Sequence, residues 1–134
     1  LLTKRRVVET IGLHDERFFA YFEEAEWCAR GRKAGFRVVC QPTAKVWHKI
    51  EPAERPQSWD YIYLMTRNRL LYLKCTGANR LTTAMAIVDL LRTAASWATK
   101  PQHRDMRPCS SAIVRGVSDF LTGHFGAPPK RGLW

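Results

Sequence analysis

The chain has 134 residues, 46% of them hydrophobic, which is enough for a packed core and excludes wholesale disorder. Its apolar runs are only a few residues long, far below the roughly 20 that a membrane-spanning helix needs. No basic-then-apolar signal segment opens it, and Cys28, Cys40, Cys75 and Cys109 lack metal-ligand or redox spacing. We interpret them as thiols of a reducing compartment and predict a cytoplasmic location.

The net charge of +10 is concentrated in the second half of the chain. Residues 1–60 hold 11 basic and 9 acidic residues, whereas residues 61–134 hold 11 basic and 3 acidic residues. A surplus of this size attracts phosphates, and charge alone does not distinguish those of nucleic acid, anionic lipid or a sugar nucleotide.

The first third of the chain predicts short helices and short strands. Residues 1–12 are typical of a strand end followed by a helix, and residues 23–35 predict a helix with acids first and bases last, as the helix dipole favours. Residues 36–40 and 44–48 are rich in β-branched and aromatic side chains and flank a Gln-Pro-Thr turn. They therefore predict two strands.

The rest of the chain, after Pro52 and Pro56, predicts three helices. Apolar residues recur at three- and four-residue intervals over about 57–75, 79–99 and 110–122. We attribute these apolar faces to packing of the helices on one another. The predicted class is α/β to α+β, with two short strands and a helical extension.

Residues 12–48 carry the chemical signal, in the sequence GLHDERFFAYFEEAEWCARGRKAGFRVVCQPTAKVWH. This stretch resembles the inverting, GT-A-fold glycosyltransferases of family 2 type, especially the rhamnosyltransferase-like branch that builds bacterial surface polysaccharides. The later segment YIYLMTRNRLLYL is similar to the Arg-Asn-Arg-Leu helix of the same branch. The span from residue 12 to residue 73, which contains both segments, covers about half of the chain.

The resemblance implies that Glu24 is the catalytic base that takes a proton from the acceptor hydroxyl. The family has Asp at that position, so this chain departs from its pattern by one methylene group. Glu23 is adjacent and diverges from Glu24 by about 100° on a helix, which suits acceptor positioning. The alternative is that these carboxylates only favour a helix N-terminus.

Four further residues are candidates for substrate contact. The resemblance implies a donor-side or metal contact for His48, and Trp47 can stack on a sugar ring. Arg67 and Arg69 match phosphate oxygens of a donor or acceptor. The alternatives are a structural or surface role for His48, core packing for Trp47 and a solvated helical face for the two arginines.

The resemblance also implies the domain plan. Residues 1–52 would be the acceptor-side, C-terminal part of a Rossmann-like GT-A domain, residues 53–126 a helical extension and residues 127–134 a flexible tail. The nucleotide-binding half and its Asp-x-Asp motif are absent from this chain. We therefore expect Mg or Mn only in the full-length enzyme, none tightly bound here, and no transfer by the isolated chain.

The expected partners are a nucleotide sugar and a saccharide or lipid-linked acceptor. The alternative function is a basic helical module that binds an anionic membrane surface, at the inner membrane face, or nucleic acid. No zinc-finger spacing or RNA-binding signature supports specific nucleic-acid binding. The exposed edges of the two predicted strands lead us to expect a homodimer.

Overall fold

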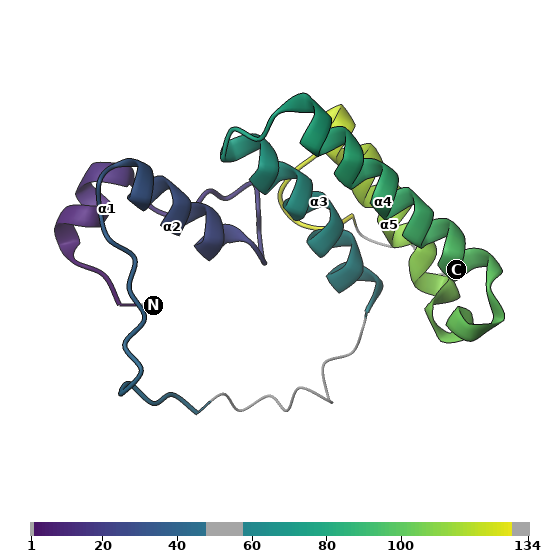
Figure 1. Cartoon of the computed structure of the whole chain (residues 1–134), viewed down its shortest axis with the longest axis horizontal. Coiled ribbons are helices and arrows are strands. Elements are labelled where there is room, and N and C mark those ends of the chain that lie inside the picture. The colour runs from purple at the N-terminus through teal and green to yellow at the C-terminus, as the bar shows by residue number, and fades with distance from the viewer. Residues whose placement is uncertain (1, 48–57, 130–134) are drawn as a thin grey trace.

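The computed structural model describes residues 2–47 and 58–129, and these contain helices joined by loops. The α-helices are α1 (Arg5–Ile11), α2 (Glu23–Lys33), α3 (Trp59–Cys75), α4 (Arg80–Thr99) and α5 (Arg107–Thr122), with the 3-10 helix η2 (Pro101–Met106) before α5. In Figure 1, α3, α4 and α5 form a bundle, and α1 and α2 lie to one side of it.

The predicted α/β to α+β class, a fragment of a Rossmann-like GT-A domain with two short strands, is wrong, because no described residue lies in a strand. Residues 36–40 and 44–47 lie outside helices and strands, so their β-branched side chains have no partner strand to pack against. Val39, Val46 and Trp47 are 74%, 89% and 83% exposed. Only the turn between them forms, closed by the hydrogen bond from the Ala44 amide to the Gln41 carbonyl.

We expected a homodimer because the two predicted strands would have exposed edges. Without those strands, this reason no longer holds. The prediction of a homodimer is itself untested. Likewise, His48 and the two prolines of the predicted boundary lie outside the described residues.

Local signals explain where the helices of the bundle begin and end. Ser58 caps α3 by accepting a hydrogen bond from the Tyr61 amide, and Asn79 caps α4 by accepting one from the Thr82 amide. Helix α5 ends at Gly123, whose φ of 79° is a conformation that glycine adopts without steric cost. The helix positions predicted from apolar spacing are therefore confirmed to within a few residues.

The core of the bundle lies where α3, α4 and α5 meet. Its buried members come from all three helices: Leu70, Ala86, Leu90, Ala94, Ile113 and Val117. Helix α5 packs against α3 at Gly116, where the backbones approach closely. None of the described helices is long and apolar enough to cross a membrane.

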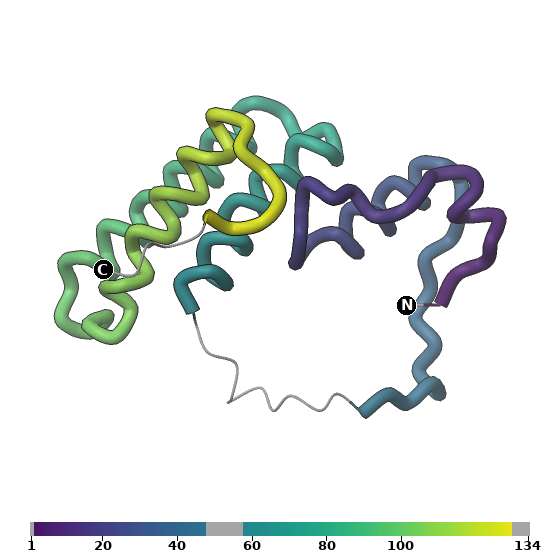
Figure 2. Tube along the Cα trace, turned by 180° about the vertical axis from the view of Figure 1, so that it is seen from behind, coloured from purple at the N-terminus to yellow at the C-terminus, as the bar shows by residue number. Residues whose placement is uncertain are grey.

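The segment that follows α5 returns across α3, as Figure 2 shows from behind. The Gly126 amide donates to the Arg17 carbonyl at 2.9 Å, and the Phe125 ring lies 6.0 Å from the Arg67 guanidinium carbon. The bundle therefore contacts the loop between α1 and α2, which is where the candidate site begins.

Candidate functional site

The loop of residues 12–22, between α1 and α2, has an unusual backbone. Phe19, Tyr21 and Phe22 have φ angles of 63°, 67° and 70°, in the left-handed region. For residues with a Cβ atom this conformation costs roughly 1–2 kcal/mol each. Such strain persists only where the surroundings over-determine the backbone, and it clusters at functional sites.

Asn68 of α3 is the main anchor of this loop. Its side-chain amide is fully buried and donates to the carbonyls of Phe18, Ala20 and Tyr21 at 2.8, 2.7 and 2.9 Å. Phe18 is itself fully buried. One asparagine therefore holds the strained part of the loop on α3.

Arg67, also fully buried, is the second anchor. Its guanidinium donates to the carbonyls of Arg17 and Phe18, both at 3.3 Å, and to the Tyr63 hydroxyl at 3.2 Å. Tyr63 in turn donates to Asp119 at 2.7 Å. Burial, followed by the hydrogen bond to Asp119, raises the pKa of Tyr63. The Tyr63 hydroxyl group therefore links the buried Arg67 guanidinium to the Asp119 carboxylate.

These contacts give Arg67 a loop-anchoring position. Its predicted contact with a phosphate group stays a prediction. Asn68 has no functional assignment from the sequence, although it lies in the Arg-Asn-Arg-Leu motif. The available signal was a run of three polar residues, 67–69, directly before Leu70 and Leu71 on a helix with a buried face.

Helix α2 holds the other side of the loop. Arg30 donates to the Leu13 carbonyl at 2.9 Å and makes two hydrogen bonds of 2.9 Å with the buried Glu26. The Trp27 ring nitrogen donates to the Gly12 carbonyl at 2.9 Å. The acids and bases of α2 therefore do more than match the helix dipole, because Glu26 orients the arginine that holds the loop.

Within the loop, Asp15 and Arg17 form a local ion pair. Arg17 Nη2 lies 2.6 Å from Asp15 Oδ2, and the Arg17 amide donates to Asp15 Oδ1 at 3.0 Å. The side-chain hydrogen bond from Arg17 is the main cause of the lowered pKa of Asp15. Asp15 thus accepts hydrogen bonds from both the side chain and the backbone of Arg17.

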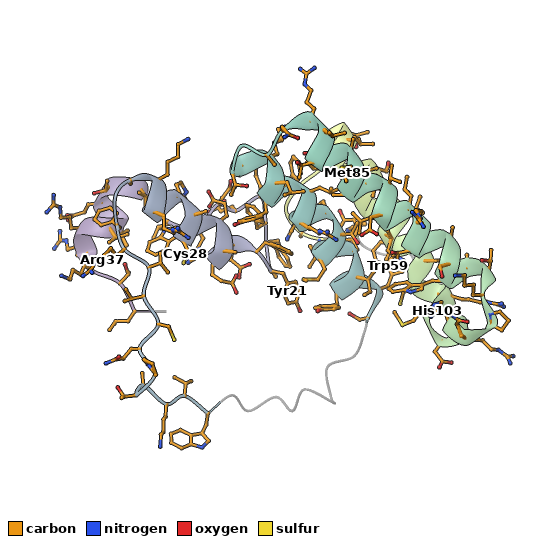
Figure 3. All side chains as sticks on the ribbon, viewed as in Figure 1. Tyr21, Cys28, Arg37, Trp59, Met85 and His103 are labelled. Atoms are coloured by element: carbon orange, nitrogen blue, oxygen red, sulfur yellow. The ribbon has the colours of Figure 1, made fainter. Side chains whose placement is uncertain are left out.

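Glu23 and Glu24 are the first two residues of α2, directly after the strained loop. The Glu24 side chain is exposed to solvent. Glu23 is half-buried, and its Oε2 atom is buried without a hydrogen-bond partner among the described residues. Tyr21, labelled in Figure 3, lies where α2 begins, and its ring meets Tyr61 of α3 edge-on at 5.2 Å. The junction thus presents one accessible carboxylate and one carboxylate oxygen that lacks a donor.

Two other predicted site residues, Arg69 and Trp47, share no described hydrogen bond or ion pair with this junction. Arg69 is exposed, and its Nη1 is 3.9 Å from Oδ2 of Asp89 on α4. Trp47 is exposed at the end of the first described range, and His48 lies just outside it. Within the described ranges, no hydrogen bond or ion pair joins Trp47 or Arg69 to the two glutamates. Their roles in substrate binding stay predictions.

Within residues 2–47 and 58–129, no three His, Cys, Asp or Glu side chains lie close enough together to bind a divalent metal ion. Glu26 is already paired with Arg30, whose Nε atom lies 2.9 Å from Glu26 Oε1.

Among known proteins, the chain is similar to the low-salt glycan biosynthesis hexosyltransferase Agl10 of Haloferax volcanii, with 33% identity over 72 residues. The match covers 53% of this chain and 24% of that protein, so the chain spans about a quarter of the length of its curated relative. No protein-family model and no solved structure matches the chain. The similarity supports a relationship to the glycosyltransferases, without specifying their fold or stereochemical type.

Proposed function

We propose that the chain is the acceptor-side, C-terminal part of an inverting, family 2-type glycosyltransferase that is rhamnosyltransferase-like and acts in surface-polysaccharide synthesis. In this proposal residues 1–52 form the acceptor-side unit, residues 53–126 its helical extension and residues 127–134 a tail. The similarity to a hexosyltransferase supports the reaction class, and the motif of residues 12–48 supports the type.

The junction between the strained loop and α2 is the observation that carries the proposal. Two buried side chains, Arg67 and Asn68, hold the loop in a conformation that its aromatic residues would otherwise avoid. The chain thereby fixes the direction in which α2 starts and leaves Glu24 in contact with solvent. A base on a rigid helix end, open on one side, suits proton transfer from an incoming hydroxyl group.

The reaction assigned to this site is a single displacement. The Glu24 carboxylate takes the proton of an acceptor hydroxyl as that oxygen attacks the anomeric carbon of the nucleotide sugar. The new glycosidic C–O bond forms as the bond from the anomeric carbon to the diphosphate breaks. The nucleoside diphosphate leaves with the bonding electron pair, and the anomeric configuration inverts.

Glu23 is assigned to acceptor positioning. A buried carboxylate oxygen without a hydrogen-bond donor is costly, so the free Oε2 atom calls for a donor from outside the described residues. A second hydroxyl group of the saccharide acceptor supplies one. Trp47, His48 and Arg69 remain proposed contacts for the sugar ring and the donor diphosphate, and Arg67 would reach a phosphate only by leaving its carbonyl partners.

The test is sugar transfer from nucleotide sugars by the full-length protein that carries this chain. Glu24→Gln keeps the size of the side chain and removes the base, so we expect kcat to fall by about 10²–10⁴-fold with donor binding unchanged. Glu24→Asp restores the residue of the resembled family and is expected to retain most of the turnover. Product stereochemistry, read by NMR, is expected to be inverted.

Glu9→Gln is the matched control, because Glu9 is an exposed carboxylate whose partner is Arg5 on the same helix. It removes one negative charge and is expected to leave kcat unchanged. Full activity of Glu24→Gln would remove the base assignment but keep the reaction class. Retention of configuration would rule out the displacement described here.

A further inference from the structure

Helix α4 is apolar on two opposite faces. Its inner face packs on α3 and α5 through Ala86, Leu90 and Ala94, which are at most 9% exposed. On its outer face, side chains three or four residues apart remain open to solvent: Leu81 at 69%, Met85 at 63%, Val88 at 55% and Leu91 at 41% exposed. Packing of the helices on one another therefore explains the apolar residues on the inner face of α4 but not those on its outer face.

An apolar face of a helix is normally buried against another element. Single exposed apolar residues are ordinary, but a continuous patch marks an interaction surface. The outer face of α4 forms a shallow groove of about 430 Å³ that includes Leu81, Met85 and Val88. Figure 3 labels Met85 on this helix.

The patch continues onto α5. A second groove, of about 420 Å³, adjoins the first at Ala84 and reaches Phe120 and Leu121, the latter 66% exposed. Lys74 and Arg80 line this second groove, and Arg92 lines the first. We define the α4 face as Leu81, Ala84, Met85, Val88, Leu91 and Leu121, with these three cations at its margin. Asp89 is the acid in the first groove, and Arg69 lies 3.9 Å from it.

We propose that the α4 face binds an anionic lipid surface, with α4 lying flat in the interfacial region. An apolar stripe bordered by lysine and arginine has the chemistry that binds the boundary between acyl chains and acidic headgroups. The charge of the whole bundle favours this occupant, because residues 58–129 hold nine basic and four acidic residues. Two copies paired through the same face would bring their cationic margins together, which opposes self-association.

The test is co-sedimentation of the chain with vesicles of equal parts phosphatidylcholine and phosphatidylglycerol. We expect binding at low salt, release at high salt and little binding to phosphatidylcholine alone. The double variant Met85→Asp/Val88→Asp places two carboxylates in the apolar stripe, and we expect its vesicle affinity to fall by about tenfold or more. Lys74→Gln/Arg80→Gln/Arg92→Gln is expected to weaken both the binding and its salt dependence.

Leu2→Asp/Val46→Asp is the matched control, since it makes the same charge change at two aliphatic residues that are 99% and 89% exposed. It is expected to bind vesicles as the unchanged chain does. Circular dichroism checks that each variant keeps its helices, and Met85→Ser/Val88→Ser replaces the acidic pair if that pair unfolds. Light scattering without lipid reports the oligomeric state.

Three results would overturn the proposal: no binding to the acidic vesicles, equal loss of binding in the control pair, or a dimer that the α4 variants convert to a monomer. In the last case a second copy occupies the face. None of these measurements depends on sugar transfer, so the proposal stands or falls separately from the glycosyltransferase function.

Discussion

The loop of residues 12–22 and the bundle of α3, α4 and α5 are held in place by opposite kinds of interaction. The carbonyl groups of the loop accept hydrogen bonds from Asn68, Arg67, Trp27 and Arg30, all of which lie outside it. The bundle rests on a cluster of aliphatic side chains. Burial of apolar area is non-directional, whereas each hydrogen bond fixes the distance and direction of a carbonyl group from its donor. The bundle supplies stability, and the loop receives its geometry from a few polar groups.

The largest expected effect is the loss of the Asn68 anchor. Asn68→Ala leaves the carbonyls of Phe18, Ala20 and Tyr21 without their donor, and we expect the free energy of unfolding to fall by about 4 kcal/mol. Urea denaturation followed by circular dichroism measures the change. Asn79→Ala removes a helix cap instead and is expected to cost about 1 kcal/mol. Equal costs at the two positions would contradict the contrast.

The two faces of α4 provide the next test. Leu90 is 9% exposed and belongs to the bundle core, so Leu90→Ala is expected to destabilise the chain by about 3 kcal/mol through the cavity that it leaves. Leu81 is 69% exposed, and Leu81→Ala should change stability by less than about 0.5 kcal/mol. The midpoints of urea unfolding give both values. A large loss at Leu81 without lipid would mean that the outer face is already covered.

Two glycines within helices are expected to respond with opposite sign to the same substitution. A Cβ atom at Gly116 would lie 3.0 Å from the Thr66 side chain and the Tyr63 carbonyl, so Gly116→Ala is expected to cost about 2 kcal/mol. At Gly31 the nearest atom is Ile11 Cδ1 at 3.6 Å, an ordinary contact. Gly31→Ala is therefore expected to stabilise α2 by about 0.5–1 kcal/mol. Thermal unfolding compares the two variants directly.

The smallest expected effect is a pH dependence within the loop. Because Arg17 lowers the pKa of Asp15 in the folded chain, the pair contributes stability above the ordinary aspartate pKa, near 3.9. That contribution is lost as the pH falls through the lowered value. The difference in unfolding free energy between the unchanged chain and Asp15→Asn should therefore shrink below about pH 4. A difference that is constant with pH would contradict the pairing.

The sequence predicted the helices well, because apolar spacing, caps and glycines are local signals. It wrongly predicted strands at residues 36–40 and 44–47, because a strand depends on a partner strand that local composition does not specify. It also located Glu23 and Glu24 at the start of a helix but missed what holds them there. The anchor Asn68 lies far along the chain, and its three acceptors are backbone carbonyls that leave no trace in side-chain identity.

The distance in sequence between the loop and its anchor has a consequence for the order of folding. The hydrogen bonds of Asn68 span 47 to 50 residues, so the left-handed aromatic residues have no compensation until α3 is present. During synthesis the loop and α2 emerge before α3, and the loop samples relaxed backbone states until α3 is present. The orientation of Glu23 and Glu24 is therefore fixed late in folding, when α3 packs on the loop. A chain that ended before α3 would contain both carboxylates, but their orientation would not be fixed.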